Sequence, residues 1–140
     1  MPWGEDFSSP FFLKKFPAAR FDPLRPSHSL LRMSAGQVRT PKLGLLLSCG
    51  PDHPGFGHGV QLAAAALRQG MDTYLYCLDD AVVGVSDPDL QALRQRGLKL
   101  YACAYGAHQR GLPIDDQAAY AGLTVVSDLI SSTDRFVSFN

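Results

Sequence analysis

Short apolar segments alternate with helical segments along most of this chain, and this alternation restricts its fold more than any other feature. From Lys42 onward, four apolar runs have the length and residue types of β-strands, and turn-forming residues separate them from stretches with helical periodicity. The predicted strands cover residues 43–48, 72–78, 98–104 and 135–139. Parallel strands need crossover connections, and helices between the strands supply them. We therefore expect an α/β fold, a small three-layer, doubly wound sandwich with a mainly parallel sheet.

Two of the predicted helices have clear start or stop signals. The first covers residues 57–70 and ends at Gly70, which suits a left-handed cap. The second begins after Asp87, with Pro88 in its first turn, and extends to about Arg96. In the first helix, four residues at helical spacing are expected to form one apolar face: Val60, Ala63, Ala64 and Leu67.

The rest of the chain predicts three further helical pieces. Residues 105–110 form a short helical turn, and Asp115 or Asp116 caps another piece. The last helix covers residues 124–132. Four of its side chains are expected to face inward: Val125, Val126, Leu129 and Ile130.

The segment before Lys42 has a different character. Prolines recur in it without any sustained helical or strand period. We expect an irregular or flexible N-terminal extension over residues 1–41 and one α/β domain over residues 42–140. Met33 is an alternative natural start, because the regular pattern begins a few residues after it.

The composition excludes several classes of partner. The chain of 140 residues carries 13 basic and 13 acidic residues, so its formal charge gives no basis for binding nucleic acid or an anionic membrane. It has no run of the roughly 18 apolar residues that a membrane span needs. Three widely spaced cysteines fit neither a paired disulfide framework nor a zinc knuckle, which favours a reducing, cytoplasmic location.

The strongest candidate for chemistry is Cys103, in the segment LKLYACAYGAHQRG. It lies at the carboxyl end of a predicted strand and faces the first turn of the following helix, where unpaired N–H groups favour the thiolate. His108 and Arg110 would add positive charge if the turn folds back toward the sulfur, and Tyr105 would form a wall beside it. The alternative is a buried core thiol, a common place for a free cysteine.

The other candidate groups carry weaker signals. Cys49 ends the first predicted strand and could form a resolving disulfide with Cys103 if their strands were neighbours, although a loop cysteine without a role is the simpler interpretation. Cys49, Asp52, His53 and His58 lie close in sequence, but their spacing matches no standard metal site, and we expect no metal or organic cofactor. The remaining tyrosines are interpreted as packing residues.

Residues 42–139 resemble the DsrE/DsrF-like family, which includes the TusD-type subunits of sulfur relay systems. The resemblance rests on four segments in the same order: PGFGHGVQLAAAALRQGMD, TYLYCLDDAV, CAYGAHQRG and STDRFVSF. The third is the most specific, because sulfur-carrying members of the family place the reactive cysteine shortly before an Arg-Gly pair, as Cys103 and Arg110-Gly111 do here.

The resemblance implies a persulfide carrier in which Cys103 accepts sulfane sulfur from a donor protein and passes it to an acceptor cysteine. It also implies homo- or hetero-oligomers, as trimers or hexamers, and no cofactor. The alternative is an oligomeric scaffold or small-ligand-binding protein of the same fold that does not transfer sulfur.

Overall fold

A computed structural model of the protein describes residues 38–140. The predicted extension therefore falls almost entirely outside the described residues, as does Met33. The described helices and strands are, in chain order, β1 (Lys42–Leu47), α2 (Pro54–Arg68), β2 (Asp72–Cys77), η2 (Asp79–Ser86), α3 (Pro88–Gln95), β3 (Lys99–Cys103), α4 (Ala104–Gln109), β4 (Ala119–Ala121), α5 (Thr124–Ser132) and β5 (Arg135–Phe139).

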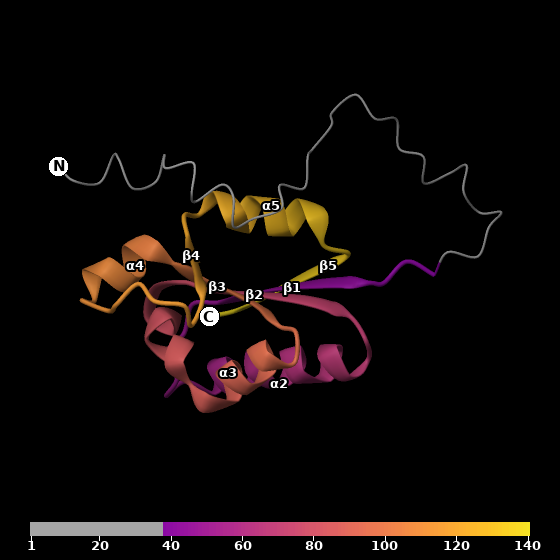
Figure 1. Cartoon of the computed structure of the whole chain (residues 1–140), viewed down its shortest axis with the longest axis horizontal. Helices are drawn as coiled ribbons and strands as arrows, with labels where there is room; N and C mark the ends of the chain where they lie inside the picture. The colour runs from indigo at the N-terminus through magenta and orange to yellow at the C-terminus, as the bar shows by residue number, and fades with distance from the viewer. Residues whose placement is uncertain (1–37) are drawn as a thin grey trace, which may run out of the picture. The chain divides into compact units, whose positions relative to one another are not determined.

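The strands form one sheet in the order β4-β3-β2-β1-β5, and every neighbouring pair is parallel (Figure 1). Parallel pairing confirms the fold class predicted from the alternating pattern. The register aligns Leu47 with Cys77 and Cys77 with Ala102, so the carboxyl ends of the three central strands meet at one edge. The loops that follow these ends carry the candidate residues.

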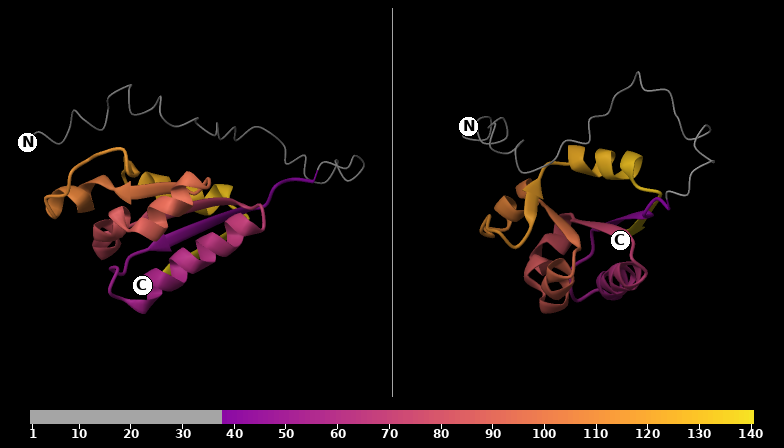
Figure 2. Two further views of the ribbon diagram at one scale, coloured as in Figure 1. Left: turned by 60° about the horizontal axis from the view of Figure 1, so that its bottom comes forward. Right: turned by 45° about the vertical axis from the view of Figure 1, so that its right-hand side comes forward.

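Helices cover both faces of the sheet. Helices α2 and α3 lie together on one face, and α5 lies on the other (Figures 1 and 2). The core between the layers is built mainly from aliphatic side chains, and the strand residues Leu45, Leu47 and Leu75 are fully buried. Burial on both faces explains why the strands are nearly continuous apolar runs.

Local caps set the helix boundaries. Helix α2 begins at Pro54, earlier than expected, because the His53 ring accepts a hydrogen bond from the Gly55 N–H at 3.1 Å. At its other end, Gly70 has a φ of 73°, as the predicted left-handed cap requires. Asp87 caps α3 by accepting hydrogen bonds from the next two N–H groups after Pro88.

The segment after β2 is the 3-10 helix η2. Two expectations were wrong. The helical piece expected after Asp115 is a turn followed by β4, because the Asp115 carboxylate accepts the Gln117 N–H at 3.0 Å and the chain then pairs with β3. Ile130 of α5 is 55% exposed, since this helix buries only one narrow stripe, centred on Leu129.

Candidate functional site

Cys103 lies where the third strand becomes a helix. It is the last residue of β3 and the residue before α4, and its Sγ accepts a hydrogen bond from the Gly106 N–H at 3.4 Å. Its residue surface is only 5% exposed. A Cβ atom at position 106 would lie 3.3 Å from Val82 Cγ2, so glycine allows Val82 to pack closely against this helix start. The local sequence therefore holds the thiol against the start of α4 in a buried position.

Tyr76 lies near the same residue. Its hydroxyl donates to the carbonyl oxygen of Ala121, the β4 residue that aligns with Cys103, at 3.0 Å. The side chain is fully buried, and burial first, then the neighbouring Cys103, raises the pKa of this hydroxyl well above its ordinary range. The sequence interpretation of Tyr76 as a packing residue missed this contact.

Strand register explains how Tyr76 reaches Ala121 and comes to lie near Cys103. Tyr76 of β2 aligns with Tyr101 of β3, and Cys103 lies two residues further along the same strand. Side chains alternate between the two faces of a sheet, so Tyr76 and Cys103 share a face. Ala121 of β4 aligns with Cys103, so the Tyr76 side chain extends past β3 to the next strand. Only the register reveals this contact.

Arg110 ties α4 to the segment after β2. Its Nη2 forms an ion pair with Asp80 Oδ1 at 2.8 Å, and its Nη1 donates to the Gly106 carbonyl at 3.3 Å. The guanidinium therefore contacts Gly106, the residue whose N–H donates a hydrogen bond to the Cys103 sulfur. Asp79, next to Asp80, has a φ of 48°, a left-handed conformation that aspartate tolerates better than most residues.

Two other predicted site residues lie on the solvent side of α4. Tyr105 is 59% exposed, and His108 is also exposed. The predicted roles of Tyr105 as a wall and of His108 as a source of charge at Cys103 remain predictions.

Cys49 does not meet Cys103. It follows β1, is half-buried, and its Sγ lies 3.8 Å from the Phe139 carbonyl oxygen on the side of β5. Strand β2 lies between β1 and β3, and two strand spacings of about 4.8 Å each exceed the Cα separation that a disulfide spans. The condition for a resolving disulfide, neighbouring strands, is therefore not met.

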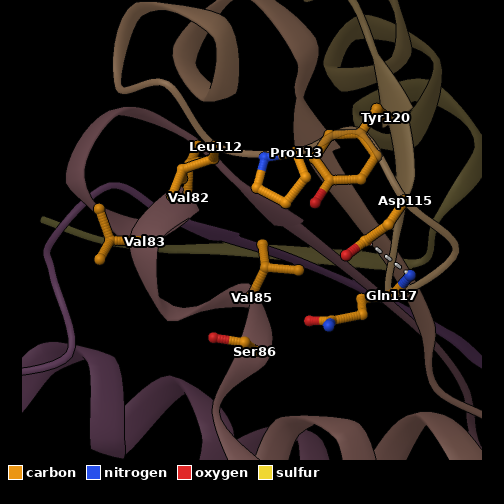
Figure 3. Close-up of a pocket in the computed structure, with 9 residues that line it drawn as sticks. All are labelled: Val82, Val83, Val85, Ser86, Leu112, Pro113, Asp115, Gln117 and Tyr120. Carbon is orange, nitrogen blue, oxygen red and sulfur yellow. Dashed lines mark hydrogen bonds between the residues drawn. The ribbon is translucent and has the colours of Figure 1, made fainter.

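A small pocket lies between η2 and the segment leading into β4 (Figure 3). Its volume is about 110 Å³. Val82, Leu112 and Pro113 give it an apolar lining, and Tyr120 and Asp115 lie at its polar side. Burial raises the pKa of the Tyr120 hydroxyl, and the negative charge of the nearby Asp115 carboxylate raises it further. Val82 also packs beside Gly106, so the same side chain lines the pocket and lies close to the start of α4 next to Cys103.

The loop candidates for a metal site have other contacts. His53 caps α2, as described above, and His58 is exposed on that helix. Across residues 38–140, no group of three or more His, Cys, Asp or Glu side chains is placed to hold a metal ion. Within the same residues, no helix is long and apolar enough to cross a membrane.

The architecture defines a class, the five-stranded parallel α/β proteins with the DsrE-like fold. The chain is similar in structure to the YchN protein of Escherichia coli, with a TM-score of 0.61 and 17% sequence identity over 72% of this chain and 100% of that one. It is also similar to a conserved protein of unknown function from Bacteroides thetaiotaomicron, with a TM-score of 0.57 and 14% identity over 70% of this chain and 94% of the other. At these identities the likeness shows the fold alone. No protein-family model matches the chain, and no curated protein matches it significantly in sequence.

Proposed function

We propose that this protein is a sulfur carrier that holds sulfane sulfur as a persulfide on Cys103. The observation that carries the proposal is the environment of one sulfur atom at the carboxyl edge of the sheet. The Gly106 N–H at the start of α4 donates to this sulfur at 3.4 Å and would stabilise a sulfur anion there. Stabilised thiolate is the form of cysteine that attacks a persulfide.

The position of Cys103 in the sheet supports the proposal. Cys103 ends β3, and the carboxyl ends of the parallel strands meet at this edge of the sheet. Open α/β sheets bind ligands outside the carboxyl ends of their strands.

The transfer step balances without a cofactor. The Cys103 thiolate attacks the terminal sulfur of a donor persulfide, a new bond forms between Sγ and that sulfur, and the donor leaves as its thiolate. The reverse exchange with an acceptor thiolate releases the sulfur from Cys103. The proposed partners are accordingly a sulfur donor protein and an acceptor protein in a reducing cytoplasm, with a trimer or hexamer of related chains as the proposed assembly.

A second candidate is a scaffold or small-ligand-binding protein of the same fold. Two observations favour it: the Cys103 residue is 5% exposed, and the neighbouring pocket of about 110 Å³ has room for a small apolar group. In the carrier, a partner must reach the sulfur through an opening of the η2 and α4 segments. In the scaffold, this opening has no role.

Mass spectrometry after exposure to inorganic polysulfide distinguishes the two. In the carrier, the intact protein gains sulfur that a thiol reductant removes, and peptide mapping assigns the sulfur to Cys103. The gain persists in Cys49→Ser, the matched control for a cysteine at the same sheet edge, and disappears in Cys103→Ser. Retention on Cys49 instead, or no retention in the folded wild type, contradicts the proposal and favours the scaffold.

A further inference from the structure

The pocket between η2 and the segment leading into β4 combines an apolar lining with one charged group. Val82, Val85 and Leu112 form much of the lining, and the Asp115 carboxylate and the Tyr120 hydroxyl lie at the polar side (Figure 3). Among the nine described residues that line the pocket, Asp115 is the only charged one. An occupant that satisfies this lining has an apolar stem and a donor group that can reach a carboxylate.

The surroundings of the pocket are acidic. The described segments that follow β1, β2 and β3 are residues 48–53, 78–89 and 104–118. They carry seven aspartates: Asp52, Asp79, Asp80, Asp87, Asp89, Asp115 and Asp116. Their only lysine or arginine is Arg110, whose guanidinium bonds Asp80 and the Gly106 carbonyl. An excess of carboxylates attracts cations and repels anions, so the charge favours a cationic occupant.

We propose that this pocket binds a lysine side chain of a partner protein. The aliphatic stem packs against Val82, Val85 and Leu112, and the ammonium group donates to the Asp115 carboxylate. The volume of about 110 Å³ suits one straight side chain. A cavity of about 150 Å³ is needed to hold a benzene molecule, so an aromatic ring or a nucleotide is too large.

The geometry of Asp115 favours lysine over arginine. Its Oδ1 already accepts the Gln117 N–H at 3.0 Å. A guanidinium prefers to bond both oxygens of a carboxylate side by side, whereas an ammonium is a compact charge that needs a single acceptor. One occupied oxygen therefore hinders the paired contact of arginine and leaves an acceptor for lysine.

The position of the pocket favours a protein as the source of the lysine. Val83 and Ile114, at the rim, are 50% and 59% exposed, which gives a protein surface apolar contacts that a free amine would not use. Tyr120 aligns with Ala102, the residue before Cys103, so the partner would lie beside the proposed sulfur site. That the partner is a sulfur donor or acceptor rests on the proposed function, whereas the lysine pocket does not.

The experiment follows the amide chemical shifts of the full chain, labelled with nitrogen-15, during titration with small probes. The lysine probe is N-acetyl-lysine N-methylamide, and its norleucine analogue keeps the stem but lacks the ammonium group. We expect the lysine probe to shift the amides of residues 82–86 and 112–120 and to bind about three- to fivefold more tightly than the norleucine probe, as for a partly exposed ion pair. A third probe, n-butylamine, represents a free amine and should bind more weakly than the lysine probe.

Two matched variants locate the charge. Asp115→Asn should remove the preference for lysine over norleucine, and its amide oxygen can still accept the Gln117 N–H, so the turn is kept. Asp116→Asn is the control, because it removes the same charge from the next residue, which is exposed and does not line the pocket. It should keep most of the preference.

Each outcome has a defined meaning. Equal binding of the lysine and norleucine probes to wild type overturns the inference, as does the absence of shifts around the pocket. An equal loss in both variants also overturns it, because the charge would then act from a distance. Tighter binding of n-butylamine than of the lysine probe assigns the pocket to a free amine and overturns the protein partner. No sulfur enters these titrations, so their failure leaves the carrier standing, and a wild type that retains no sulfur contradicts the carrier alone.

Discussion

Cys49 and Cys103 both follow strands at the carboxyl edge of one parallel sheet, yet their surroundings differ. The Cys49 sulfur is half-buried beside the edge strand β5, with the Phe139 carbonyl oxygen 3.8 Å away. The Cys103 sulfur is buried, and the Gly106 N–H donates a hydrogen bond to it. The first thiol is partly exposed beside an acceptor, whereas the second is buried beside a donor.

The difference shows that strand position does not by itself make a reactive cysteine. A carbonyl oxygen beside a sulfur disfavours negative charge on it, whereas N–H and O–H groups favour it. At Cys103 the donor is a backbone N–H of the helix that starts directly after β3. We call the packed segments η2 and α4 the cover of Cys103. Chemistry at Cys103 therefore requires the cover to open, whereas chemistry at Cys49 does not.

The largest expected effect concerns the third thiol, which serves as an internal reference. Cys77 is fully buried in β2, and burial raises the pKa of its thiol to about 12. Its alkylation should trail that of Cys49 by a factor on the order of 10³ or more, because it requires global unfolding. Timed labelling with peptide mass spectrometry measures both rates. Comparable rates without denaturant would contradict the burial of β2.

The next largest effect is a loss of stability on adding a side chain inside η2, where the packing leaves no room. A Cβ at Gly84 of η2 would lie 2.5 Å from the Phe56 ring and 2.9 Å from Pro51 Cγ. We expect Gly84→Ala to lower the free energy of unfolding by about 1–3 kcal/mol. Gly57→Ala is the control, because nothing lies within 4 Å of that position in α2, and it should raise stability by up to about 1 kcal/mol. Urea titrations compare the two, and equal midpoints would show that η2 tolerates repacking.

Much of the fold, but less of the site, could be predicted from the sequence. The α5 and β5 ranges were predicted residue for residue, because apolar periodicity and turn residues act locally. Strand β4 was missed because three residues give no period, and their pairing depends on the exposed edge of β3. The Tyr76 contact was missed for a related reason, since strand order and register, which bring β2, β3 and β4 together, are not written in any one segment.

Breaking the Arg110–Asp80 pair should loosen the cover with little loss of stability. The pair is partly exposed, so Asp80→Asn should cost less than about 1 kcal/mol of unfolding free energy. Because the pair joins η2 to α4, we expect Cys103 alkylation to become several-fold faster while Cys49 alkylation stays the same. Asp72→Asn is the control, since its pair with Lys99 lies at the opposite edge of the sheet. An unchanged Cys103 rate would mean that the ion pair does not hold the cover closed.

The smallest effect should come from Asp134, which directly precedes β5. Cys49 lies beside Phe139, at the other end of that strand. The Lys42 N–H donates to its carboxylate at 2.7 Å, and this hydrogen bond, with a smaller contribution from Arg39, lowers the pKa of Asp134 despite partial desolvation. A carboxyl whose pKa is lowered in the folded state stabilises that state above its unfolded value of about 4, and the contribution is lost as the pH falls through the folded value. Asp134→Ala should therefore lose less stability on acidification than wild type, as urea midpoints across this range would show. At neutral pH, the looser β5 should raise Cys49 labelling a few-fold and leave Cys103 labelling unchanged. If the labelling rates of both thiols rise equally, the surroundings of Cys49 and Cys103 open together, and the distinction between a partly exposed thiol and a buried one fails.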